Sequence, residues 1–138
     1  MKPKKILFIL ALLAATVGFF FFIYQNKIER INNDWNTKIE GKIDKDISSE
    51  IGPHGEHVQY FSIKNTNMNY IKNLITQNQI KSDTAIEQIK NIVITDLPKA
   101  HLILAKENHF GILTKDNCNL ILWYSDDTNE VHLIENLS

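Results

Sequence analysis

The sequence predicts an α+β fold in which an N-terminal transmembrane helix precedes a small domain. Three features predict it: an uncharged apolar run at residues 6–24, helical spacing of apolar residues over residues 25–94, and apolar segments divided by turn residues near the end of the chain. The predicted order is a transmembrane helix, an amphipathic helix, then two helices packed on a four-stranded antiparallel meander. A fifth strand is the open alternative.

Composition limits the function classes. The chain has 138 residues with 43% hydrophobic and 22% charged residues, which is typical of a folded protein and not of a disordered one. Without the apolar run and the tail before it, about 114 residues remain, enough for one small domain. The formal net charge is −1, and no basic cluster predicts nucleic-acid binding. The single cysteine, Cys118, forms no internal disulfide, so stability must come from packing.

The apolar run predicts a membrane span. Its 19 residues, 6–24, carry no charge, and as a helix they would rise about 28 Å against a hydrocarbon core of about 30 Å. A cleaved signal peptide needs a shorter core and a small-residue cleavage site, and here cleavage would leave several phenylalanines near the new terminus. We therefore expect an uncleaved signal anchor in contact with the lipid bilayer, with cleavage as the alternative.

The charges beside this run predict its orientation. Lys2, Lys4 and Lys5 precede it, whereas Lys27, Glu29 and Arg30 after it are mixed in sign. The positive-inside rule then makes residues 1–5 a cytoplasmic tail. We expect a single-pass protein of the bacterial inner membrane whose remaining part is periplasmic or extracellular.

An amphipathic juxtamembrane helix is predicted for residues 25–52. Its apolar residues recur every three or four positions: Ile28, Ile31, Trp35, Ile39, Ile43, Ile47 and Ile51. Gly52 and Pro53 end it, so the extracytoplasmic domain is expected at residues 53–138. This helix either covers the domain's sheet or mediates self-association.

Between this helix and the meander, one strand and two helices are predicted. Residues 58–63 have strand character, and residues 67–80 have helical spacing. The second helix starts near Ser82 or Thr84, since Thr84 and Glu87 have the spacing of a capping box, and it stops before Pro98. Residues 92–95 alternatively form a strand.

The last forty residues predict the meander. Its strands are residues 101–106, 109–114, 119–125 and 130–136. Pairing outward from each turn sets large residues opposite one another: Ala105 with Phe110, Ile112 with Ile121, Phe110 with Trp123, and Ile121 with Ile134. Both faces are apolar, so both need a cover. One face, called the Trp123 face below, carries Phe110, Ile112, Ile121, Trp123 and Ile134. We expect the two later helices on one face of the sheet and the juxtamembrane helix on the other, unless the Trp123 face is open to a partner.

The candidate site residues form two groups. Trp123, Phe110 and Ile121 are candidate binding residues if their face is open, and ordinary core residues if it is covered. His54 and His57, with Glu56 as a third donor, are candidate zinc or copper ligands in a glycine-containing loop, although such loops mostly hold no metal. The meander register also places His101 and His132 on the Trp123 face and His109 opposite.

These observations favour binding over catalysis. The sequence holds no nucleophile elbow, phosphate-binding glycine loop or dinucleotide fingerprint, so no catalytic residue is predicted. We expect a protein-interaction domain with an envelope partner, such as a subunit of an envelope complex or an immunity factor. A pilin-like structural subunit that self-associates and a small periplasmic metal or ligand binder remain as alternatives. The pilin alternative lacks the expected acidic residue within the apolar run.

Overall fold

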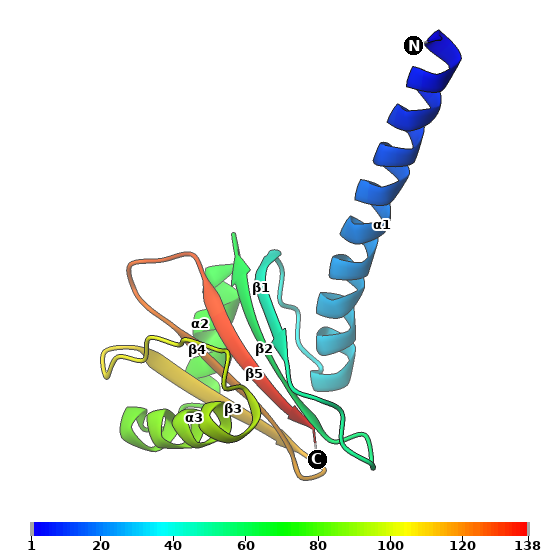
Figure 1. Cartoon of the computed structure of the whole chain (residues 1–138). Coiled ribbons are helices and arrows are strands. Elements are labelled where there is room, and N and C mark those ends of the chain that lie inside the picture. The colour runs from blue at the N-terminus through cyan, green and yellow to red at the C-terminus, as the bar shows by residue number, and fades with distance from the viewer. Residues whose placement is uncertain (1, 138) are drawn as a thin grey trace. The chain divides into compact units, whose positions relative to one another are not determined.

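The computed structural model describes residues 2–137, without the side chains of residues 24 and 25, and it has the α+β class expected from the sequence. The chain consists of two compact units, Met1–Thr37 and Lys38–Ser138, and each is described by itself. The first is essentially one helix. The second contains the sheet and the two remaining helices, and it carries every site considered below (Figure 1).

The first unit is the helix α1, Pro3–Trp35. Proline suits the first turn of a helix because its missing N–H would have no partner there. The helix ends at Asn36, whose φ of 52° is left-handed. In the described residues α1 is the one helix that is long and apolar enough to cross a membrane. Its large apolar side chains between Ile6 and Phe22 are exposed, with Leu7 at 71% and Phe8 at 70%, whereas Ile28, Ile31 and Trp35 are buried.

The second unit is built on a five-stranded sheet in which every neighbouring pair is antiparallel. Its strands, in the spatial order β1-β2-β5-β4-β3, are β1 (Lys42–Ser48), β2 (His57–Lys64), β5 (Val131–Leu137), β4 (Cys118–Tyr124) and β3 (His109–Lys115). The register predicted for the last three strands is confirmed, with Phe110 opposite Trp123, and Ile121 between Ile112 and Ile134. A meander therefore forms three of the five strands, and the hairpin of β1 and β2 forms the other two.

The prediction of one helix over residues 25–52 was wrong beyond Trp35, because residues 42–48 form the edge strand β1. A bulge lies between Ile43 and Lys45. Ile43 pairs with Ile63 and Ile47 pairs with Tyr60, which places the two isoleucines of β1 on opposite faces. Ile47 thereby joins the core on the Trp123 face.

The predicted strand at residues 101–106 was also wrong, and Ala105 does not pair with Phe110. Residues 78–80 occupy the outer edge of β3 instead. The Ile80 N–H donates to the Phe110 carbonyl at 3.1 Å, and the Ile112 N–H donates to the Asn78 carbonyl at 3.0 Å. Because residues 78–80 already form the hydrogen bonds at this edge of β3, residues 101–105 do not pair there and form no strand.

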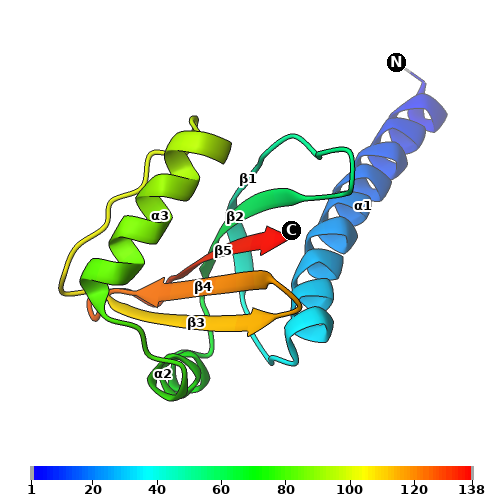
Figure 2. The same cartoon turned by 90° about the horizontal axis from the view of Figure 1, so that it is seen from below.

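The two helices of this unit cover opposite faces of the sheet, whereas the sequence predicted them on one face (Figure 1 and Figure 2). α2 (Met68–Gln77) passes so close to Gly111 that a Cβ there would lie 3.1 Å from the Ile75 Cα. Ala85 and Ile89 of α3 (Ser82–Asp96) pack in the core with Trp123. The chain therefore crosses from one face to the other along the β3 edge.

The start of α3 agrees with the first of the two predicted positions, Ser82, but the capping box predicted at Thr84 and Glu87 does not form. The helix begins at Ser82, and Lys81 precedes it without a side-chain cap, so Thr84 lies inside the first turn. Its end follows the prediction, because Asp96 is the last helical residue before Pro98. Residues 92–95 are helical, so the alternative prediction of a strand there was wrong.

Gly41 turns the chain into β1, and we expect Gly41→Ala to destabilise the domain. Its φ is +143°, and an added Cβ would lie 2.6 Å from the Lys64 carbonyl oxygen. Such strain costs about 1–3 kcal/mol. Gly55→Ala is the control, since φ is +82° there but the space is open. Chemical denaturation should show the larger loss for Gly41→Ala; equal losses would contradict the steric explanation.

Candidate functional site

The three candidate binding residues lie in the core of the domain. Trp123, Phe110 and Ile121 are 2%, 1% and 2% exposed, and they pack with Ala85 and Ile89 of α3. The Trp123 face is therefore covered, and these side chains offer no surface to a partner in this structure. Their role as core residues, which the sequence left open, is the one that their burial supports.

The two candidate metal ligands lie in and beside the loop between β1 and β2. The His57 Nδ1 donates to the Gly55 carbonyl oxygen at 3.0 Å, and the Glu56 carboxylate accepts from the His54 N–H at 2.8 Å. Both hydrogen bonds therefore join residues within the segment 54–57. Among residues 2–137 no three histidine, cysteine, aspartate or glutamate side chains gather as metal ligands would.

His57 and Glu56 instead line a cleft, which is the first candidate site. It encloses about 690 Å³ between the end of β1, the β1–β2 loop, the C-terminal turn of α3 and the end of β5. Ligand sites typically enclose about 300–1,000 Å³. The end of β5 lies beside the β1–β2 loop in Figure 1, and His57 pairs with Leu137 across that junction. The cleft is thus assembled from segments that are distant in sequence.

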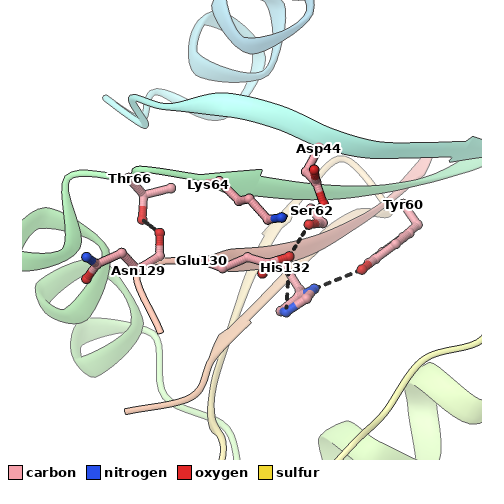
Figure 3. Close-up of polar contacts among 8 residues, drawn as sticks. All are labelled: Asp44, Tyr60, Ser62, Lys64, Thr66, Asn129, Glu130 and His132. Carbon is pink, nitrogen blue, oxygen red and sulfur yellow. Dashed lines mark hydrogen bonds and ion pairs between the residues drawn. The ribbon is translucent and has the colours of Figure 1, made fainter. Parts of the chain in front are cut away.

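A chain of polar side chains on the Trp123 face is the second candidate (Figure 3). The Tyr60 hydroxyl is 2.8 Å from the His132 Nδ1, and the His132 Nε2 is 3.9 Å from the Glu130 carboxylate. The Ser62 hydroxyl donates to that same carboxylate. Trp123 stacks on the His132 ring, with centroids 5.2 Å apart. These four residues, Tyr60, Ser62, Glu130 and His132, are called the polar group below. The polar group connects β2 to β5 and to the residue that precedes β5.

Two contacts at the margins of this group hold the surrounding strands. Lys64 Nζ lies 3.2 Å from the Asp44 carboxylate and so connects β2 to β1. The Thr66 hydroxyl donates to the Asn129 carbonyl at 3.1 Å, which connects the end of β2 to the β4–β5 turn. Both contacts appear in Figure 3. Both contacts connect segments next to the polar group to their neighbours.

Burial sets the protonation of this group. Loss of water raises the pKa of Tyr60 to about 12, and the charges of Glu130 and Asp44 add to the rise. Loss of water also lowers the pKa of His132; Glu130 opposes this shift and Lys45 adds to it. At neutral pH Tyr60 is therefore protonated and the His132 ring is uncharged, so the hydroxyl donates to the ring nitrogen.

This arrangement does not prepare a nucleophile. A catalytic serine needs its hydroxyl on a histidine nitrogen, with a carboxylate orienting the other nitrogen. Here Ser62 donates to Glu130, and the His132 Nδ1 is occupied by Tyr60. Ser62 is fully buried, and none of the four residues lines the cleft as the structure describes it. The group satisfies buried hydroxyls, which is a structural role.

We expect His132 to make the stability of the domain depend on pH. Since its pKa is lower in the folded protein, the unfolded chain binds more protons as the pH falls below about 6.5. The free energy of unfolding should therefore decrease as the pH falls from about 7 to 5, by at most about 1.4 kcal/mol per pH unit from this residue. Denaturant titrations of the His132→Gln variant should show a flatter profile.

His109→Gln serves as the control, because His109 stacks on Tyr124 and hydrogen-bonds Asp126 at 3.1 Å, away from the polar group. Its pH profile should keep the slope of the wild-type protein. An equal slope in His132→Gln would show that burial of His132 does not govern the response.

The sequence indicated only part of these sites. The positions of His132 on the Trp123 face and His109 on the opposite face agree with the register, whereas His101 lies outside the sheet. Tyr60, Ser62 and Glu130 were not predicted as site residues. Tyr60 and Ser62 alternate along β2, which the sequence shows, but the pairing of β2 with β5 that brings them to Glu130 could not be read from it.

Comparison of the chain with protein-family models, with curated proteins and with solved structures finds no match.

Proposed function

We propose that this chain is a single-pass membrane protein whose α+β domain lies outside the cytoplasm and binds another protein of the cell envelope. The observation that carries the membrane part of the proposal is the exposed apolar surface of α1. Phenylalanine and leucine side chains are more than half exposed on this helix, at 62% for Phe22 and 58% for Leu10. So large an apolar surface is unfavourable in water and favourable in a bilayer.

The charges beside the span support the orientation. Three lysines precede it within five residues, and the residues that follow are mixed in sign. The domain is therefore assigned to the periplasm or cell exterior. There the absence of a disulfide is consistent with a core that is well packed, such as the stack of Phe110, Trp123, His132 and Tyr60.

Binding is preferred over catalysis because the polar groups of the second candidate site are bonded to one another, which leaves the cleft as the place for a partner. An envelope-complex subunit and an immunity factor both fit this design. The identity of the partner would distinguish them.

Crosslinking in cells tests the proposal. The tagged full chain is crosslinked, solubilised in detergent, purified and examined by mass spectrometry. A chain that keeps α1 but carries an unrelated domain is the control. One stoichiometric envelope protein, missing from the control, is the expected result. Self-crosslinks alone would favour the structural alternative, and recovery of the chain by itself would contradict the proposal.

A further inference from the structure

The rim of the cleft is mainly acidic. Glu50, Glu56 and Asp96 line it, with Lys99 as the one basic residue among the described lining residues. The unit that contains the cleft is acidic too, since its ten basic and fourteen acidic side chains give a formal charge of −4. The cleft is therefore a region of negative potential.

The end of α3 strengthens this potential. Thr95 and Asp96, the last residues of the helix, line the cleft, and the last turn has no basic residue. The C-terminus of a helix carries a partial negative charge from its unpaired carbonyl groups. An aspartate at that end is unfavourable for the helix itself. Asp96 thus opposes stability, and a cation in the cleft would relieve the repulsion.

The floor of the cleft is apolar. Val58 and Leu97, which belong to the core of the Trp123 face, line it together with Ile47 and Leu137. An occupant needs apolar groups to contact this floor and a positive charge to face the rim.

We infer that the cleft binds a segment of the envelope partner in which a lysine or arginine stands beside apolar side chains. This inference rests on the proposed function, which supplies a protein partner. Such a segment places its apolar side chains on Ile47 and Leu137, the half-buried residues of the floor, and its cationic group near Asp96 and Glu50. The negative rim also directs approach, so the interaction weakens as salt rises.

Peptide binding to the full chain tests the inference. The protein is held in nanodiscs of uncharged phosphatidylcholine, and fluorescence anisotropy follows a labelled Lys-Leu-Lys-Leu-Lys peptide and its Glu-Leu-Glu-Leu-Glu counterpart. We expect the basic peptide to bind at least about tenfold more tightly at physiological salt. The double variant Glu50→Gln, Asp96→Asn should lose about tenfold in affinity, which corresponds to about 1.4 kcal/mol.

Glu87→Gln is the matched control. Glu87 is exposed on α3 but lines a different hollow, with Lys90 and Ile94. This variant should bind the basic peptide as the wild type does. Both neutralised rim residues are exposed, and the double variant should unfold at no lower temperature than the wild type, because removal of Asp96 relieves the helix end.

Three results would overturn the inference: equal binding of the two peptides, unchanged affinity in the double variant, or full displacement of the peptide by hexylamine, which would indicate a site for small organic cations. These results are separable from failure of the proposed function. A chain with no partner in cells but with this peptide preference would contradict the proposed function and leave only the peptide preference of the cleft. A cellular partner that binds the double variant as well as the wild type would contradict the inference alone.

Discussion

Trp123→Ala should lower the free energy of unfolding by about 3–5 kcal/mol, the cost typical of removing a large buried aromatic side chain. Trp123 is 2% exposed, and its ring stacks on those of Phe110, His132 and Tyr60 at centroid distances of 6.2, 5.2 and 6.1 Å. Truncation would leave a cavity bounded by three rings and α3. Denaturant unfolding monitored by circular dichroism measures the loss.

A pair of isoleucines provides the control for this prediction. Ile121 is 2% exposed and Ile103 is 92% exposed, so the same change to alanine tests burial alone. Ile121→Ala should cost about 2–5 kcal/mol, and Ile103→Ala should stay within about 0.5 kcal/mol of the wild type. A Trp123→Ala variant as stable as the wild type would mean that this face is open, and the candidate binding role would return.

Replacing Leu12 and Leu13 by lysine should release the chain from membranes. Both side chains lie in the middle of the apolar run and are exposed, at 60% and 56%. A charged residue at the centre of a span opposes insertion by about 2.5–3.5 kcal/mol, so two would remove most of the driving force. Alkaline carbonate extraction of cell membranes measures the result, with the wild-type chain in the pellet and the variant in the supernatant.

Leu12→Ala with Leu13→Ala is the control, because it shortens the same two side chains without adding charge. This variant should remain in the pellet. A lysine variant that resists carbonate extraction as well as the wild type would refute the assignment of α1 as the membrane anchor.

Local pattern was enough to predict the elements whose partners are close in sequence. The strands β3, β4 and β5 follow one another through short turns, so pairing outward from each turn gave the observed register. The apolar spacing before Pro98 likewise predicted α2 and α3. Their placement on opposite faces depends on how residues 78–80 cross the β3 edge, and the spacing of apolar residues does not predict this crossing.

The strand β1 was missed for a physical reason. Ile39, Ile43 and Ile47 are spaced by four, and that spacing gives a common face in a helix and also in a regular strand. The bulge then moved Ile43 and Ile47 to opposite faces, which neither pattern predicts. Gly41 was the available signal, since glycine within a helix costs about 1 kcal/mol relative to alanine.

The segment at residues 101–106 shows the opposite error. Its alternating apolar residues have strand character, and Leu102 and Leu104 do pack on the core while Ile103 is exposed. The strand did not form because residues 78–80 hold the edge that it would need. The cleft and the polar group could not be predicted for a related reason, because each joins segments that are distant in sequence.

The orientation of the domain is tested most directly by labelling single cysteines in intact cells with a membrane-impermeant maleimide. In a Cys118→Ala background, one variant carries Asp127→Cys in the exposed β4–β5 turn, and another carries Lys5→Cys before the span. We predict that Asp127→Cys is labelled in intact cells, whereas Lys5→Cys is labelled only after permeabilisation. Labelling of Lys5→Cys with protection of Asp127→Cys would place the domain in the cytoplasm and contradict the proposed function.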